Sequence, residues 1–260
     1  MGLKSKFKTL LWFIKRPNMY RQLGFLLYQR LFPHPLEDTR AEATRWCQQR
    51  SVSSFKAIEI LTGNERVLSI EELFPEFLAN AQQIVNDLPV KMGGEADLEL
   101  LYYLAEKWQA KTIVETGVAY GWSSSIFLLS LQHRPGGKLF STDMPYPKMN
   151  NESFVGCVVP DELKSNWTLV SLPDRQALTK IKRKIEEIDL CHYDSDKSYR
   201  GRMWAYKKLW HILRSGGLFI SDDVNDNVAF RDFSNKLGLK PIVVFYEPEN
   251  KYVGILVKSI

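Results

Sequence analysis

The 260-residue sequence contains little cysteine, and no two of its cysteines are close together. Cys47, Cys157 and Cys191 lack the CxxC spacing of zinc sites and redox pairs. We therefore expect reduced thiols and a cytoplasmic protein. The four histidines, His34, His133, His192 and His211, also lack the spacing of a metal site.

Long apolar runs are absent as well, since no stretch approaches the roughly 20 residues needed to cross a bilayer. Acidic residues are missing from residues 1–36, whereas seven basic residues occur there: Lys4, Lys6, Lys8, Lys15, Arg16, Arg21 and Arg30. The other 224 residues carry 28 basic and 30 acidic groups. Because the basic excess is confined to one terminal arm, a nucleic-acid substrate is not expected.

The basic arm, residues 1–36, also contains apolar clusters at 10–14 and 25–28. A basic amphipathic segment of this kind can lie on the anionic inner face of a membrane. It can equally pack on its own domain or on a second subunit of a homo-oligomer. Amphipathicity alone does not separate these interpretations.

From about Leu98 onward, short apolar runs alternate with helical patterns, which is typical of βαβ units. The predicted strands span 112–115, 138–142, 168–171, 188–193, 218–221, 242–246 and 252–257, and the helices between them span 123–132, 175–187, 199–213 and 228–237. The connection 247–251 is too short for a crossover helix, so the last two strands form an antiparallel hairpin. The sequence predicts an α/β protein with a Rossmann-like, doubly wound, seven-stranded sheet that is otherwise parallel.

Three regions follow from this pattern: the arm 1–36, a helical cap region 37–106 and a catalytic domain 107–260. The cap region contains helical patterns interrupted by Pro75, Pro89 and the pair Gly93-Gly94. We expect it to cover one edge of the sheet and to help form the substrate side.

A glycine turn joins the first strand of the predicted domain to its helix. The segment 113–123 contains Glu115, Gly117, Tyr120, Gly121 and Ser123. Glycine in such a turn lets the backbone approach a ligand, and the following helix offers free N–H groups. The glycines are not spaced as in GxGxxG, and a turn that only packs a strand against a helix stays an alternative.

Acidic residues follow the next two strands at the same edge of the sheet. Asp143 lies 26 residues after Gly117, where doubly wound folds place the acid that binds ribose hydroxyls. Met144 could lie against an adenine ring or simply fill a gap. Asp174 follows the third strand and is either a ligand contact or an N-cap of the next helix.

The pattern Val114-Glu115-x-Gly117-x-x-x-Gly121-x-Ser123 resembles the cofactor motif of class I methyltransferases. It looks like the motif of the metal-dependent catechol, caffeoyl-coenzyme A and macrocin-type sugar O-methyltransferases. The resemblance implies S-adenosylmethionine as cofactor, with Glu115 and Gly117 at its methionine end, Ser123 at its carboxylate and Asp143 at its ribose. One departure is Ser171-Leu172-Pro173, where relatives often have glycine on the adenine side.

Acidic residues also end the fourth and fifth predicted strands, as Asp194 and as Asp222-Asp223. Three carboxylates meeting at one edge would repel unless a cation lay between them, and oxygen ligands favour Mg²⁺, Mn²⁺ or Ca²⁺. The resemblance implies the same three metal ligands and places Lys197 where the catechol enzyme has its catalytic lysine. Alternatively, Asp222-Asp223 caps a helix and the segment from Asp194 is a polar loop.

We therefore predict an O-methyltransferase that acts on a hydroxyl of a small molecule or saccharide, with Lys197 and Asp194 as catalytic residues. The metal would lower the pKa of the substrate hydroxyl, and Lys197 would take its proton if its own pKa were depressed. Two rivals stay open. One is a hydroxylase-like member of the same fold, similar to the cephalosporin-hydroxylase group, and the other is a silent nucleotide-binding protein.

Overall fold

The structure, a computed structural model, describes residues 3–147 and 149–259, of which 3–8 by backbone alone. The predicted arm is thus described from Leu3 onward, and residues 1, 2, 148 and 260 lie outside the described residues. The strands are β1 (Ser51–Ser53), β2 (Thr112–Thr116), β3 (Lys138–Thr142), β4 (Trp167–Val170), β5 (Ile188–Tyr193), β6 (Leu213–Ser221), β7 (Ile242–Tyr246) and β8 (Lys251–Val257). The α-helices are α1 (Leu3–Ile14), α2 (Tyr20–Leu31), α3 (Arg40–Gln48), α4 (Ser54–Thr62), α5 (Ile70–Leu73), α6 (Pro75–Asn86), α7 (Leu98–Lys107), α8 (Trp122–Leu131), α9 (Asp174–Lys182), α10 (Tyr199–Ile212) and α11 (Ala229–Leu237).

The strands form one mixed sheet in the order β1-β7-β8-β6-β5-β2-β3-β4. Strand β8 runs antiparallel to both β7 and β6, and the other neighbouring pairs are parallel. This confirms the doubly wound sheet and its C-terminal hairpin. The sheet has an eighth strand, however, because β1 pairs with β7 over three residues from Ser51 to Ser53. A strand from the region 37–106, predicted as helical, therefore joins the edge of the sheet.

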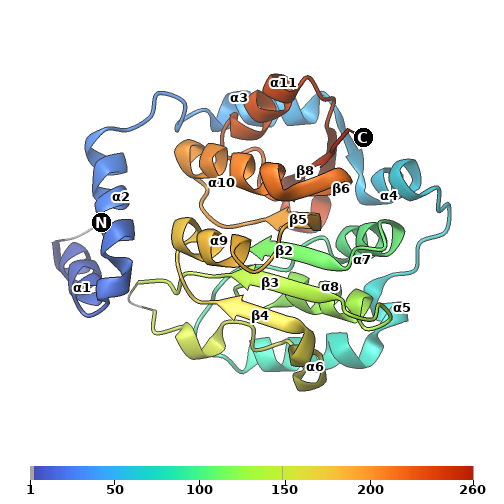
Figure 1. Ribbon diagram of the computed structural model, residues 1–260, viewed down its shortest axis with the longest axis horizontal. Helices are drawn as coiled ribbons and strands as arrows, with labels where there is room; N and C mark the ends of the chain where they lie inside the picture. The colour runs from blue at the N-terminus through green and yellow to red at the C-terminus, as the bar shows by residue number, and fades with distance from the viewer. Residues whose placement is uncertain (1–2, 148, 260) are drawn as a thin grey trace.

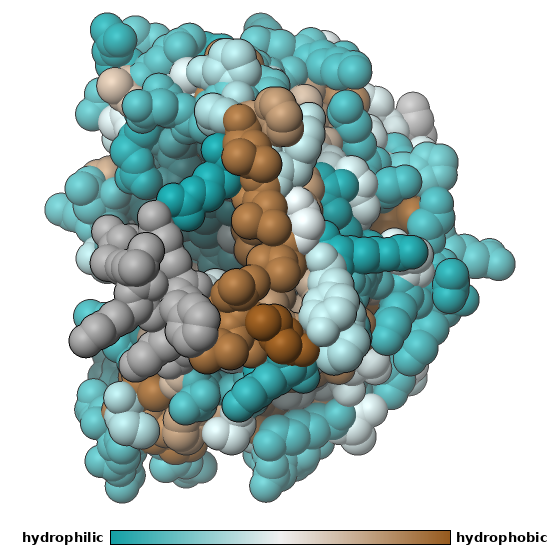
Figure 2. Space-filling model, turned by 90° about the vertical axis from the view of Figure 1, so that its left-hand side faces the viewer, coloured by the Kyte–Doolittle hydropathy of each residue, from teal (hydrophilic) through white to brown (hydrophobic). Residues whose placement is uncertain are grey.

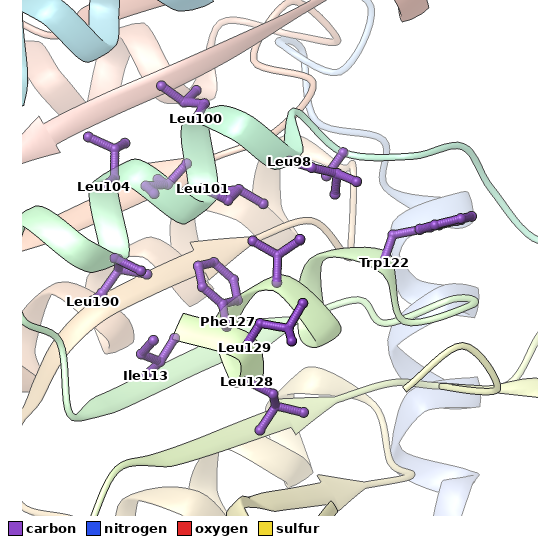
Figure 3. Packing of buried hydrophobic residues seen from close by; sticks show 14 of the residues in the cluster. Leu98, Leu100, Leu101, Leu104, Ile113, Trp122, Phe127, Leu128, Leu129 and Leu190 are labelled. Carbon is purple, nitrogen blue, oxygen red and sulfur yellow. The ribbon is translucent and has the colours of Figure 1, made fainter. Parts of the chain in front are cut away.

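Helix α8 forms the centre of the core on one face of the sheet. All ten of its residues are buried, since α7 covers its outer side while the sheet lies beneath it. Figure 3 shows the leucines of α7, among them Leu101 and Leu104, together with Phe127 of α8 and Ile113 of β2. Burying a helix on all sides requires a nearly continuous apolar sequence, and small serines fill the positions where α8 meets polar strand ends.

The other face of the sheet is covered by α3, α9, α10 and α11. Their apolar residues pack with those of the strands in a second cluster centred on Tyr206, Phe219, Phe230 and Phe233. Helices on both faces leave the carboxyl ends of the parallel strands as the open edge, where such folds bind ligands.

The arm, α1 and α2, lies beyond these carboxyl ends (Figure 1), and the arrowheads of β2, β3 and β4 point toward α2. Trp12, Phe13 and Met19 form a small buried cluster that Met144 contacts. Arg16 forms an ion pair with Glu152, with its Nη2 2.5 Å from Oε1. The arm therefore packs on its own chain. None of the described helices is long and apolar enough to cross a membrane.

Candidate active site

A cavity of about 530 Å³ lies at the carboxyl ends of the central strands, beside α2. Eight of the residues predicted from the sequence line it: Gly117, Ser123, Asp143, Met144, Asp174, Asp194, Lys197 and Asp223. Glu115, Tyr120, Gly121 and Asp222 are not part of the described lining. We distinguish a glycine-turn side (Gly117, Ser123, Asp143 and Asp174) from an ion-pair side (Asp194, Lys197 and Asp223).

Gly117 fixes the glycine turn against the end of β5. Its φ angle is +81°, and a Cβ atom added there would lie 2.2 Å from the carbonyl oxygen of Asp194. Gly121 also has a positive φ, +99°, and stands at the N-cap of α8. Only glycine can combine this positive φ at position 117 with the close approach of the Asp194 carbonyl oxygen. The turn therefore packs the strand end and lines the cavity at once, so the two interpretations of its glycines are compatible.

Glu115 is fully buried behind the turn. Its carboxylate accepts hydrogen bonds from the hydroxyls of Ser123 and Ser124, both at 2.5 Å, and of Ser141 at 2.8 Å. These bonds join β2, β3 and the first turn of α8. In this structure Glu115 thus holds the turn in place, and its contact with a cofactor stays a prediction.

Tyr120 supports a loop that lines the cavity. Its hydroxyl donates a hydrogen bond to the carbonyl of Val90 at 2.8 Å and accepts one from the N–H of Met92 at 3.0 Å. Met92 and Gly94 are part of the lining. Tyr120 therefore positions the 90–94 loop, which the sequence had indicated only as a glycine break.

Asp143 closes the glycine turn from the neighbouring strand. Its Oδ2 accepts hydrogen bonds from the N–H groups of Val118 at 2.8 Å and Ala119 at 3.0 Å. Burial raises the pKa of the Asp143 carboxyl, although both backbone N–H groups oppose the shift. Met144 lines the cavity and packs on the buried cluster of the arm.

Asp174 is the first residue of α9, and Pro173 takes the N-cap position before it. The N-cap interpretation of Asp174 is therefore wrong by one residue. Its carboxyl accepts hydrogen bonds from the hydroxyls of Thr142, at 3.1 Å, and Ser195. Burial raises the pKa of Asp174 to about 6 despite these donors.

The ion-pair side is centred on the ammonium of Lys197. Its Nζ pairs with Oδ1 of Asp194 and lies 2.7 Å from Oδ2 of Asp223. Burial disfavours the ammonium, but the two carboxylates outweigh it and raise the pKa of Lys197 above its usual value. The same lysine outweighs burial at Asp223 and lowers the pKa of that carboxyl. The depressed lysine pKa that a general base requires is therefore not found.

Asp222 pairs with a different lysine, Lys251. The Nζ of Lys251 lies 2.9 Å from Oδ2 of Asp222 and 2.6 Å from Oε2 of Glu249. Burial, with Asp194 nearby, raises the pKa of Asp222. The three predicted metal ligands are thus divided between two lysines, and no group of three acidic, histidine or cysteine side chains among the described residues is arranged to hold a metal ion. The donor set does not fit a divalent cation as it stands.

Arg202 of α10 is a supporting residue that the motif analysis missed. It is 1% exposed and donates hydrogen bonds to the carbonyl oxygens of Asp222 and Asp223, both at 2.9 Å. Asp223 has a φ angle of +51°, which a non-glycine residue rarely adopts. Arg202 therefore stabilises the turn that presents the Asp223 carboxylate. A buried arginine within a helical pattern gives no sequence signal for this role.

Aromatic and arm residues complete the cavity. Tyr146 and Trp204 line it, and so do Gln22 and Leu26 of α2. Arg175 lies 4.7 Å from the ring centroid of Trp204. These residues come from loops and helices without a motif, so only the folded chain identifies them.

Known proteins support one assignment for this geometry. Residues 114–224 match the family model described as a methyltransferase domain. The chain carries a methyltransferase domain. This confirms the resemblance predicted from the glycine turn, whereas a comparison with curated proteins gave no match.

Several solved structures share the fold of this chain. An O-methyltransferase from Bacillus cereus in complex with S-adenosylhomocysteine has 16% identity and a TM-score of 0.55, with 77% of this chain and 100% of that chain covered. An O-methyltransferase of tomaymycin synthesis from Streptomyces achromogenes, in complex with S-adenosylmethionine, has 19% identity, a TM-score of 0.57 and coverages of 73% and 94%. A methyltransferase from Geobacter sulfurreducens has 18% identity, a TM-score of 0.54 and coverages of 75% and 98%.

Proposed function

We propose that this protein is an S-adenosylmethionine-dependent O-methyltransferase that acts on a hydroxyl of a small molecule or saccharide. The observation that carries the proposal is the joining of the glycine-turn side and the ion-pair side in one cavity. Of the two carboxylate oxygens of Asp143 on the glycine-turn side, only Oδ2 accepts hydrogen bonds from the described residues, so Oδ1 can accept from ribose hydroxyls. Two of the solved relatives hold this cofactor or its demethylated product.

The acceptor hydroxyl would lie on the ion-pair side. There the Lys197 ammonium donates a hydrogen bond to the acceptor oxygen, and the Asp194 carboxylate accepts the hydroxyl proton. S-adenosylmethionine, when bound, supplies a methyl group on a sulfonium, and transfer to oxygen leaves a neutral thioether. Asp223 keeps Lys197 charged, and Arg202 keeps Asp223 in place.

The pH dependence of methyl transfer tests this role of Lys197. A lysine that acts as general base loses its proton first, so the transfer rate would rise about tenfold per pH unit below its pKa. A lysine that acts as an ammonium gives a rate that stays level from pH 7 to 10, because Asp194 and Asp223 raise its pKa. We expect the level profile, measured with labelled cofactor and an acceptor found by screening phenols and sugars.

Substitution of Lys197 gives a second test of the same role. Lys197→Met should lower the turnover number by roughly two to four orders of magnitude and leave S-adenosylhomocysteine affinity within about threefold. Lys251→Met is a matched control, because it removes the ammonium that pairs with Asp222. Equal losses of turnover in both variants would contradict a specific role for Lys197.

The sequence predicts divalent-metal assistance by Mg²⁺, Mn²⁺ or Ca²⁺, whereas the lysine pairs of the site favour the opposite proposal. We propose that the reaction proceeds without a divalent metal, because Lys197 pairs with Asp194 and Asp223 and Lys251 pairs with Asp222, so each of these carboxylates already has an ammonium partner. Transfer should therefore persist in excess EDTA and rise less than about twofold with added Mg²⁺. Loss of transfer in EDTA and its recovery with Mg²⁺ would establish the metal form instead.

Two rival functions would give results in the same assays that differ from those expected of a methyltransferase. A silent nucleotide-binding protein would bind S-adenosylhomocysteine but transfer no methyl group to any acceptor. A hydroxylase-like member would also leave the label on the cofactor. The remaining sequence-based expectations stay predictions: a small-molecule or saccharide acceptor, a homo-oligomer, peripheral membrane contact and a cytoplasmic location.

A further inference from the structure

Helix α2 presents two faces with different partners. On its inner face, Gln22 and Leu26 line the cavity, and Gln29 donates a hydrogen bond to the Ser198 hydroxyl at 2.7 Å. Phe25 lies under the guanidinium of Arg175, 4.1 Å from its ring centroid. The spacing of three and four residues puts these side chains on one side of the helix. This side of α2 therefore packs on the domain and forms one wall of the cavity.

The outer face of the arm is apolar and exposed. In α2, Leu27 is 52% and Leu31 is 72% exposed, and in α1, Leu10 and Ile14 are 43% and 51% exposed. Figure 2, which looks at the side of the molecule that carries the arm, shows a continuous hydrophobic stripe across it. Contiguous apolar surface of this kind marks an interaction site more often than scattered apolar residues do.

Basic residues accompany this stripe. The first 36 residues have seven Lys or Arg and no acid, whereas the remaining chain carries slightly more acids than bases. Lys15, Arg21 and Arg30 are exposed on the same segment. The partner of the stripe must therefore be both apolar and anionic at its surface.

A second copy of the chain meets this requirement poorly. A two-fold contact would place the same basic arm against itself and bring like charges together. An anionic bilayer instead offers acyl chains to the leucines and phosphates to the arginines. We propose that the outer face of α1 and α2 docks on an anionic phospholipid surface, with the cavity wall formed by α2 directly above it. This goes beyond the proposed function, since it does not depend on which group is transferred.

Vesicle co-sedimentation of the full chain tests the proposal. The protein should bind vesicles of phosphatidylglycerol and phosphatidylcholine, and binding should weaken with salt and with omission of phosphatidylglycerol. The double variant Leu27→Ser, Leu31→Ser should bind about tenfold more weakly. Arg21→Gln with Arg30→Gln should also lose about tenfold or more, since each basic residue near the surface contributes substantially to binding.

Matched controls make the same types of substitution at exposed residues outside the arm. Phe55→Ser with Ile60→Ser changes exposed apolar residues of α4, and Lys207→Gln with Lys208→Gln removes two charges from α10. Both should bind vesicles like the unaltered protein. S-adenosylhomocysteine calorimetry on every variant shows that it is folded and reports the proposed function separately.

Several results would overturn the docking proposal. Binding that does not depend on phosphatidylglycerol, or that the α4 and α10 controls reduce equally, would show nonspecific adsorption. Absence of vesicle binding, with a dimer in light scattering that the Leu27→Ser, Leu31→Ser variant converts to a monomer, would make the stripe an interface between copies. Failure to bind S-adenosylhomocysteine, with vesicle binding intact, would refute the proposed function alone.

Discussion

The two sides of the cavity are built from different interactions. On the glycine-turn side, neutral hydroxyls hold the buried carboxylate of Glu115, and backbone N–H groups hold the half-buried carboxylate of Asp143. On the ion-pair side, the carboxylates of Asp194 and Asp223 and the ammonium of Lys197 each keep about a third of their side-chain surface exposed. Exposed ion pairs contribute little to stability and exchange partners readily. The comparison indicates that one side fixes shape and the other is free to exchange partners with a substrate.

The sharpest way to break this comparison is to remove the rigid support beneath the ion-pair side. Arg202→Met leaves the carbonyls of Asp222 and Asp223 without their buried donor, so we expect a loss of about 4 kcal/mol in the free energy of unfolding. Urea denaturation measures it. Arg202 also lies 3.4 Å from Oδ2 of Asp226, and the exposed Arg40 pairs with the same carboxylate. Arg40→Met should cost less than about 0.5 kcal/mol. A similar small loss in both variants would show that the turn at Asp223 supports itself.

A second prediction concerns Gly117, where the two sides touch. In Gly117→Ala the new Cβ would meet the backbone of Asp194, so we expect a loss of about 3 kcal/mol and at least tenfold weaker S-adenosylhomocysteine binding. Gly136→Ala is the matched control, because its φ of +79° is nearly the same but nothing lies within 4 Å of the added atom. It should lose only about 1 kcal/mol. Equal effects would mean that backbone strain, and not the contact between the two sides, sets the cost.

The sequence predicted the elements whose pattern is local. Strands β3, β5 and β7 begin and end at the predicted residues, and α10 begins at Tyr199 because the Ser198 hydroxyl accepts a hydrogen bond from the N–H of Gly201. Strand β1 escaped prediction because a three-residue segment has no detectable alternation and depends on pairing with β7, almost 200 residues away. Periodicity reports which face of an element is buried, and it carries no information on such distant pairing.

The sequence predicted where the backbone places the acidic residues of the site, but it did not predict which side chains pair with them. Motif spacing placed Asp194, Asp222 and Asp223 at neighbouring strand ends, as found. It did not predict that Lys197 and Lys251 would pair with them, because Lys251 approaches from β8 at a separation of 29 residues from Asp222. The inner face of α2 was equally inaccessible to motif analysis, since nothing in residues 20–31 indicates contact with the cavity.

The smallest predicted effect tests whether burial raises the pKa of a carboxyl that has no cation as a partner. Asp97, the N-cap of α7, is 3% exposed, and its donors among the described residues are neutral: the Leu100 N–H at 3.1 Å and the Ser54 hydroxyl at 2.5 Å. Burial raises the pKa of Asp97 to about 6. The protonated carboxyl therefore makes its full contribution to the free energy of unfolding below about pH 4, and this contribution is lost as the pH rises through about 6. Asp97→Asn keeps the cap and removes the charge. Relative to the unaltered protein, its free energy of unfolding should therefore gain about 2 kcal/mol between pH 4 and pH 7, measured by urea denaturation at each pH. The exposed Asp161→Asn should leave the pH dependence in this window nearly unchanged, and an Asp97→Asn profile parallel to that of the unaltered protein would show that Asp97 stays ionised in the fold.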